Sequence, residues 1–300
     1  MSFAVPPPSA RLRAIGPVAG LPEPVKRALE PRGDFFDPLP TPGPNDWLAN
    51  HPEPGQTFEQ FLHSQPNRPD AVRRKLYLQP LGEFAEDKAP PLGRLRQFAA
   101  GFFGMEIGVL PSVNLMQSTI TVRQNPFTRN TQLLTTDILT LLRRRLPEDG
   151  YALLGITTED LYPEPSWNFV FGQASLRHRA GVYSFARYDP RFYGEVNIED
   201  GRALLLRRSC KVLAHEMAHM FGIQHCIYFR CLMNGSNHLA ESDARPLHLC
   251  PVELRKLYES VGFDILERYS RLLEFNREVG FEDEVRWLKG RITFLARDRS

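Results

Sequence analysis

The chain has 300 residues, of which 42% are hydrophobic and 24% are charged, and its formal net charge is +2. This balance gives no reason to expect nucleic acid or an anionic membrane surface as a partner, and no apolar run approaches the ~18 residues that a membrane span needs. The proline-rich start of the chain, MSFAVPPPSARLRAIGP, lacks the long apolar stretch of a secretory signal. We therefore expect a cytoplasmic protein that binds neither nucleic acid nor membranes.

Residues 1–70 are unusually rich in proline and hold fifteen of the 26 prolines in the chain. Segments such as VPPPS and DPLPTPGPND do not suit a helix interior or a central strand. We predict an extended, partly ordered arm over residues 1–70. The aromatic and leucine side chains of its second half are the expected docking points, namely Trp47, Phe58, Phe61 and Leu62.

Beyond the arm, hydrophobic periodicity predicts a body of mixed strands and helices over residues 71–300. Expected strands lie at 75–82, 151–157, 167–176 and 180–188, and expected helices at 92–104, 130–147, 201–221, 251–275 and 283–296. The runs at 167–176 and 180–188 are expected to be neighbours in one sheet. Strands mixed with helices indicate an α+β fold, which we expect to divide into an upper subdomain over 71–221 and a lower one over 222–300.

The segment HEMAHMFGIQH, residues 215–225, carries a pattern of metal ligands. His215 and His219 lie four residues apart on a predicted helix, so both imidazoles can reach one zinc ion at ~2.0–2.1 Å. Glu216 then projects near the metal without binding it and is placed to act as a general base. Gly222 allows the sharp turn that would bring His225 to the same ion. Three histidines leave one position open, as in catalytic zinc sites.

Met233 follows the third histidine by eight residues, in CLMNG, and suits the methionine turn that lies beneath the metal in metzincins. Together with the extended histidine pattern, this resembles the metzincin clan of zinc metallopeptidases.

A closer resemblance is to the archaemetzincin family. It rests on HCIYFRCLM directly at the third histidine, and on GITTEDLYPEPSWNFVFGQASL, GVYSFARY and NGSNHLAESDARPLHLCP elsewhere. The segment DWLANHPEPGQTFEQF also resembles the vertebrate-type members of the family. The resemblance implies a zincin-like metzincin fold with a mixed twisted sheet, an active-site helix and a C-terminal helical subdomain. It also implies an intracellular peptidase with aminopeptidase-like activity on small peptides, and a second zinc held by four cysteines.

The chain departs from the family pattern at this second site. Cys226, Cys231 and Cys250 match the pattern, but Glu253 occupies the position of the fourth cysteine. A structural zinc ion requires four ligands. Glu253 or His248 could supply the fourth. Alternatively, Glu253 is an acidic residue in the first turn of a helix, where it is favoured by the helix dipole, and the three cysteines are buried thiols.

Two functions fit these residues. The first is a zinc metallopeptidase in which Glu216 acts on the zinc-activated water and an extended peptide pairs with an edge strand from 167–176 or 180–188. The second is a zinc-binding interaction protein with negligible turnover. Glu216 favours the peptidase, since a pure binding module has no chemical need for that carboxylate. The remaining cysteine, Cys210, lies on the opposite side of the same helix and is not expected to bind the metal.

Overall fold

The computed structural model describes residues 3–84, 88–194 and 201–297. The chain divides into two compact units. The helical unit comprises Met1–Pro66, Gly101–Gly104 and Gly222–Ser300, and the sheet unit comprises Asn67–Ala100 and Met105–Phe221. Within the described ranges, none of the helices is both long enough and apolar enough to span a bilayer.

A five-stranded mixed sheet, in the order β2-β1-β5-β8-β7, forms the centre of the sheet unit. Its strands are β1 (Lys75–Leu81), β2 (Glu106–Val109), β5 (Gly150–Thr157), β7 (Gly172–Ser175) and β8 (Ala180–Ser184). Neighbouring strands are parallel except β7, which runs antiparallel to β8 and lies at the end of the sheet. A smaller sheet has the order β3-β4-β6, with β3 (Val122–Gln124), β4 (Thr131–Leu134) and β6 (Asp160–Tyr162).

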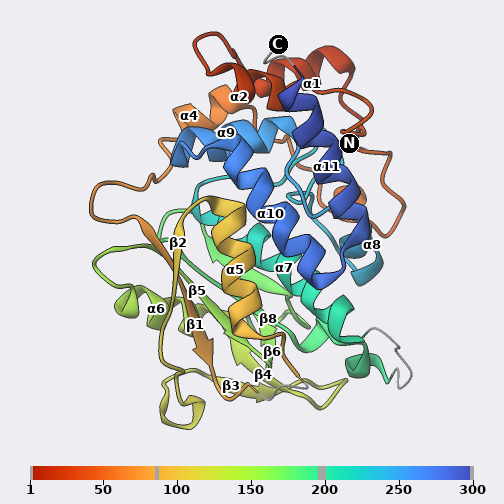
Figure 1. Cartoon of the computed structure of the whole chain (residues 1–300). Helices are drawn as coiled ribbons and strands as arrows, with labels where there is room; N and C mark the ends of the chain where they lie inside the picture. The colour runs from red at the N-terminus through yellow and green to blue at the C-terminus, as the bar shows by residue number, and fades with distance from the viewer. Residues whose placement is uncertain (1–2, 85–87, 195–200, 298–300) are drawn as a thin grey trace. The chain divides into compact units, whose positions relative to one another are not determined.

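Two helices of the sheet unit, α6 (Thr135–Arg145) and α7 (Gly201–Met220), cover opposite faces of the large sheet (Figure 1). Val182 of β8 packs in one core cluster with Ile138 and Leu142 of α6. The next residue, Tyr183, lies near Cys210 of α7. Because successive side chains of a strand point to opposite faces, the sheet is covered on both sides. This accounts for β5, in which every residue is buried.

The helical unit contains most of the remaining helices. They are α1 (Pro8–Ile15), α2 (Glu23–Ala28), α3 (Trp47–Asn50), α4 (Phe58–His63), α8 (Leu239–Ala244), α9 (Pro251–Val261), α10 (Ile265–Val279) and α11 (Glu282–Ala296). The two longest, α10 and α11, run side by side and are drawn in blue in Figure 1. Short 3-10 helices at Leu115–Gln117, Ala186–Tyr188 and Pro190–Tyr193 belong to the sheet unit.

The N-terminal segment is more regular than the extended arm expected from its prolines. Pro8 begins α1, and a proline also lies in the first turn of α2, where the missing N–H has no helical partner to lose. At α4, the Thr57 and Gln60 side chains form a capping box. Phe58 and Phe61 of this helix are buried as predicted, whereas Leu62 is 36% exposed.

The α+β class predicted from the sequence is confirmed, and most predicted elements are present. The expected strands at 75–82 and 151–157 are β1 and β5, and the expected helices at 92–104 and 201–221 are α5 (Leu92–Phe103) and α7. The antiparallel neighbours β7 and β8 lie within 167–176 and 180–188. The prediction of a helix over 130–147 was wrong for its first residues, which form β4 before α6 begins. The helix expected over 251–275 is two helices, because Gly262 takes a left-handed conformation with φ 72°.

Candidate active site and cysteine cluster

Helix α7 brings His215 and His219 together. Their Nε2 atoms lie 3.1 Å apart, and the two rings are nearly perpendicular, at 86°, with centroids 4.6 Å apart. Two nitrogen ligands at ~2.0–2.1 Å from a tetrahedral zinc ion lie about 3.3 Å from each other. The convergence of these two nitrogens therefore fits a zinc ion, as the spacing of four residues predicts.

Glu216 follows the first histidine on α7 and is 8% exposed. Its carboxylate lies against Gly172, the first residue of the edge strand β7. A Cβ atom added at Gly172 would lie 2.8 Å from Oε1 of Glu216 and 2.9 Å from the carbonyl oxygen of Val182. Glycine therefore allows the edge strand to approach the carboxylate at van der Waals distance.

His225 ends the motif, six residues after His219, and belongs to the helical unit, whose last segment begins at Gly222. Gly222 precedes it with φ 81°, a left-handed conformation that suits glycine and follows the end of α7 at Met220. The Nδ1 atom of His225 lies 2.8 Å from Oε1 of Glu53. A carboxylate accepts and cannot donate, so Nδ1 carries the proton and Nε2 is the nitrogen that can coordinate a metal.

The loop after His225 folds back on itself and buries Met233 completely. The backbone N–H of Cys226 donates to the carbonyl oxygen of Met233 at 2.8 Å, and the N–H of Met233 donates to Sγ of Cys231 at 3.5 Å. These two hydrogen bonds thus tie the methionine to the two cysteines that precede it.

The three cysteines after the histidine motif converge. The Sγ atoms of Cys226, Cys231 and Cys250 all lie within 4.8 Å of one another, and those of Cys226 and Cys250 are 3.5 Å apart. Sulfur ligands of a tetrahedral zinc ion with Zn–S distances of ~2.3 Å lie about 3.8 Å apart. All three side chains are at most 1% exposed. The cluster therefore has the spacing of a closed thiolate site.

The three thiols of the cluster differ in how their surroundings change the pKa. Burial raises the pKa of the Cys231 thiol, but hydrogen bonds from Cys226 and Cys250 outweigh burial and lower the pKa well below its ordinary value. The backbone N–H of Cys250 adds a donor at 3.2 Å from Sγ of Cys231. For Cys226, burial dominates and raises the pKa to about 12. Hydrogen bonds from both neighbouring thiols and from the backbone thus converge on the sulfur of Cys231.

His248 does not belong to this close cluster of described residues. Its ring stacks on Trp287, with centroids 3.7 Å apart and planes at 9°, and its Nδ1 lies 3.3 Å from a carboxylate oxygen of Glu284. One face of the His248 ring and one of its two nitrogens are therefore already in contact with other side chains.

Glu253 lies beside the cluster and is fully buried. Its Oε2 pairs with Nζ of Lys256 at 2.8 Å, and neither side chain is exposed. Oε1 is buried with no hydrogen-bond partner among the described residues. Burial raises the pKa of Glu253 to about 8, with Lys256 acting in the opposite direction and Cys226 in the same direction. The Glu253 carboxyl group therefore lies beside the sulfur of Cys226, with Lys256 as its cationic partner.

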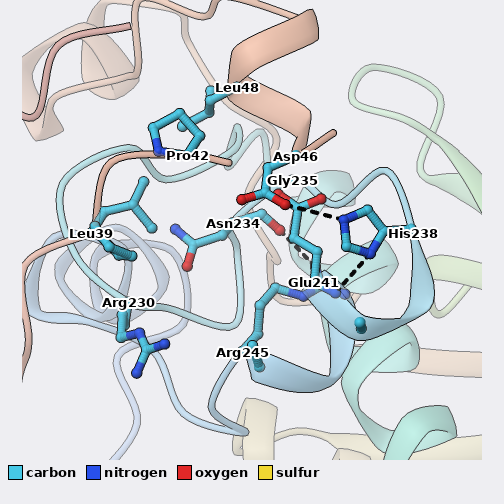
Figure 2. Close-up of a pocket in the computed structure, with 13 residues that line it drawn as sticks. Leu39, Pro42, Asp46, Leu48, Arg230, Asn234, Gly235, His238, Glu241 and Arg245 are labelled. Carbon is cyan, nitrogen blue, oxygen red and sulfur yellow. Dashed lines mark hydrogen bonds and ion pairs between the residues drawn. The ribbon is translucent and has the colours of Figure 1, made fainter. Parts of the chain in front are cut away.

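A pocket of about 310 Å³ lies in the helical unit between the segment around Leu39–Leu48 and the loop around Arg230–Arg245 (Figure 2). Its polar side carries Asp46, His238 and Glu241. Nδ1 of His238 accepts the N–H of Glu241 at 3.2 Å, and Nε2 lies 3.1 Å from Asp46. The Glu241 carboxylate accepts the N–H of Trp47 at 2.9 and 3.1 Å. Because each group already has a local partner, the cluster anchors the turn at Asp46 and Trp47.

Two residues that contact the site could not be identified from the sequence. Glu53 and Gly172 lie in segments that carry the family resemblance, but neither belongs to a ligand motif, and the contact between Glu53 and His225 spans 172 positions. Besides the resemblance, the signal near Glu53 was Trp47, which the aromatic content of its segment indicated as a docking residue.

The comparisons with known proteins concern the family of the chain. The model of Peptidase family M54 matches residues 127–259. Archaemetzincin-2 of Macaca fascicularis and that of Homo sapiens are each 40% identical over 279 residues, covering 84% of this chain and 77% of the relative. The crystal structure of an archaemetzincin from Methanopyrus kandleri matches 65% of this chain and 98% of that chain, with 26% identity and a TM-score of 0.48. The identity to these two archaemetzincin-2 sequences shows that this chain belongs to the archaemetzincin family, peptidase family M54, and is a zinc-dependent metallopeptidase.

Proposed function

We propose that a catalytic zinc is held by His215, His219 and His225 and that Glu216 is the general base of peptide-bond hydrolysis. The observation that carries the proposal is the 3.1 Å approach of the two Nε2 atoms on α7, on either side of Glu216 in the sequence. The third ligand is supported by the motif and by the proton on Nδ1 of His225, which leaves Nε2 to coordinate. When bound, zinc polarises the scissile carbonyl and activates the attacking water.

Glu216 takes the proton from the water and returns it to the leaving amine. The residue is 8% exposed, so the proton transfer takes place largely shielded from solvent. Because the carboxylate acts on water, we assign it no role as a metal ligand. A zinc-binding interaction protein with negligible turnover is not favoured, since such a protein has no use for this group. We assign Met233 to the methionine turn, as the family resemblance implies.

The substrate is proposed to bind along β7 as an added strand. This strand pairs with β8 on one side and ends the five-stranded sheet. An extended peptide on the outer edge would gain main-chain hydrogen bonds irrespective of its side chains. Gly172 begins the strand beside the Glu216 carboxylate, so a peptide paired there would have a backbone carbonyl near the general base.

Aminopeptidase-like action on small peptides and a cytoplasmic location are further parts of the proposal, and both rest on the family resemblance and the sequence. Free and N-acetylated forms of the same short peptides distinguish the mode of action. Cleavage of the first residue from the free forms alone supports an aminopeptidase, and cleavage of both forms supports an endopeptidase.

A second zinc is proposed for the cysteine cluster, with Cys226, Cys231 and Cys250 as thiolate ligands and Glu253 as the fourth. The spacing of the sulfurs and the position of the Glu253 carboxyl group beside Cys226 support this assignment. His248 is the weaker candidate, because its ring is engaged by Trp287 and Glu284. A carboxylate can bind zinc through one oxygen while the other remains paired, here with Lys256.

The test is metal content and turnover measured on one preparation. We expect two zinc ions per chain and hydrolysis of members of a peptide library, lost on chelation and restored by zinc. Full zinc loading without hydrolysis of any library peptide would overturn the peptidase proposal in favour of the interaction protein. One zinc per chain, with activity intact, would overturn only the second site.

A further inference from the structure

A carboxylate from the N-terminal segment holds the ring of His225. Oε1 of Glu53 lies 2.8 Å from Nδ1 of His225, and the side chains are 25% and 20% exposed. Had the carboxylate met the other ring nitrogen, Nε2, it would compete with a metal ion. At Nδ1 the carboxylate favours metal binding instead, because it fixes the tautomer whose Nε2 lone pair is available for zinc.

Trp47 holds the same carboxylate oxygen. Its indole Nε1–H donates to Oε1 of Glu53 at 2.9 Å, and its ring meets His225 edge-on, with centroids 5.4 Å apart and planes at 84°. On the other side, Trp47 stacks on His51 at 4.0 Å. Gly235 has no Cβ, and one placed there would collide with the indole ring. Two donors therefore converge on one oxygen, and the indole is packed from several directions.

The backbone around Glu53 is also restricted. Pro52 and Pro54 flank it and fix their own φ angles. Gly55 then turns with φ 71°, and a Cβ there would lie 2.5 Å from Ile227. Gln56 accepts the N–H of Gln224 at 3.2 Å and donates to the carbonyl of Gly222 at 3.2 Å. The segment that carries Glu53 is thus fastened to the chain just before His225 and just after it.

From these contacts we infer that Glu53, oriented by Trp47, is a positioning residue for the zinc ligand His225. It fixes the tautomer and the ring orientation of His225, so that the Nε2 atom is the one left to coordinate the ion. Such carboxylate–histidine–metal arrangements typically contribute roughly 10–100-fold to metal affinity. The inference rests on the proposed function, and it makes the N-terminal segment part of the metal site. Zinc affinity, which does not depend on turnover, is therefore the quantity to measure.

The experiment compares three full-length variants, Glu53→Gln, Glu53→Ala and Trp47→Phe, with the parent protein. Glu59→Gln is the matched control, because Glu59 is an exposed glutamate of the same segment, on α4. Zinc affinity is measured by competition with a chromogenic chelator, and the histidine site is followed by the cobalt spectrum whose bands are lost in His225→Ala. The melting temperature of each metal-free variant is measured in parallel.

We expect Glu53→Ala to weaken zinc binding at the histidine site by roughly 10–100-fold. Glu53→Gln should lose less, because its amide oxygen still accepts from Nδ1, and Trp47→Phe should also lose less, because the carboxylate remains. The cobalt bands should shift in the Glu53 variants and not in Glu59→Gln. Glu53→Gln keeps the shape of the side chain and carries the test if Glu53→Ala does not fold.

Parent-like zinc affinity and parent-like cobalt bands in both Glu53 variants would overturn the inference while leaving the proposed function intact. The inference also fails if the variants lower only the metal-free melting temperature, since that result describes a structural role. Absence of cobalt bands that depend on His225 in the parent protein would overturn the proposed function and this inference together.

Discussion

Replacing Glu253 tests both the ion pair and the second zinc site. From the sequence, the expected cost of losing this carboxylate is only that of the helix-dipole effect, about 0.3–1 kcal/mol. Above the pKa of about 8 that burial gives its carboxyl group, Glu253 is the charged counterion of Lys256, and both side chains are 0% exposed. The ammonium also donates to the backbone carbonyl of Gln56, at 2.6 Å, but this group carries no formal charge. Removal of Glu253 would therefore leave a buried charge without its counterion.

The expected loss of stability is correspondingly larger. Removing one partner of a buried ion pair costs about 3–5 kcal/mol. With a change of roughly 2–4 °C per kcal/mol for a protein of this size class, the metal-free Glu253→Gln and Glu253→Cys variants should melt roughly 6–20 °C below the parent. The double variant Glu253→Gln/Lys256→Met should recover much of this loss, because both charges are then removed.

Zinc should distinguish the two single variants. A cysteine at position 253 supplies a thiolate that matches a sulfur-rich zinc site and restores a negative charge beside Lys256, whereas glutamine supplies a weak ligand and no charge. Zinc at about 100 times its dissociation constant adds roughly 2.7 kcal/mol of stability. We therefore expect zinc to raise the melting temperature of Glu253→Cys more than that of Glu253→Gln.

The assay is thermal unfolding with and without zinc, together with zinc stoichiometry, at a pH above about 8 so that the Glu253 carboxyl is ionised in the parent. Glu267→Gln serves as the control, because Glu267 pairs with Arg271 on the exposed face of α10, where loss of an ion pair costs at most about 1 kcal/mol. If metal-free Glu253→Gln melted like this control, the buried ion pair would not have the assigned importance. If zinc stabilised Glu253→Cys no more than Glu253→Gln, position 253 would not lie at the metal.

Three further predictions concern the sheet unit and the third histidine. His225→Ala should weaken zinc binding by more than the roughly 10–100-fold expected for loss of a supporting hydrogen bond, and unchanged affinity by chelator competition would remove His225 from the ligand set. Gly172→Ala should displace the Glu216 carboxylate and reduce kcat up to about 100-fold at unchanged zinc content, and parent-like kcat would show that the contact is not critical. Asp160→Asn should lower the free energy of unfolding by about 3–5 kcal/mol, because Asp160 pairs with Arg187 through two 2.8 Å bonds in the core. A decrease in melting temperature of less than about 2–4 °C, which corresponds to about 1 kcal/mol, would refute this prediction.

Most of the correct predictions came from the spacing of residues within short segments of the sequence. The helix that holds His215 and His219 was readable because ligands four residues apart define one helix face. The convergence of Cys226, Cys231 and Cys250 followed from the family resemblance. These predictions depend on separations of a few residues or on a known pattern, so they required no knowledge of the tertiary structure.

Contacts between distant segments could not be predicted in this way. The bond from Glu53 to His225 joins residues 172 positions apart, and nothing in either local sequence indicates it. The strand β4 was assigned to a helix because its pairing with β6, which aligns Gln132 with Asp160, is also non-local. Lys256 stands only three residues from Glu253, yet its importance became apparent only from the burial of both side chains.

The assignment of Glu216 as the general base is the central claim about catalysis, and one measurement tests it most directly. Zinc-loaded Glu216→Ala and zinc-loaded parent are compared on the same peptides, with the zinc content of each determined on the same sample. We predict parent-like zinc content and a loss of turnover on the order of 100-fold or more, because the residue moves protons and does not bind the metal. Loss of zinc from the variant, or hydrolysis at the parent's rate, would contradict the assignment.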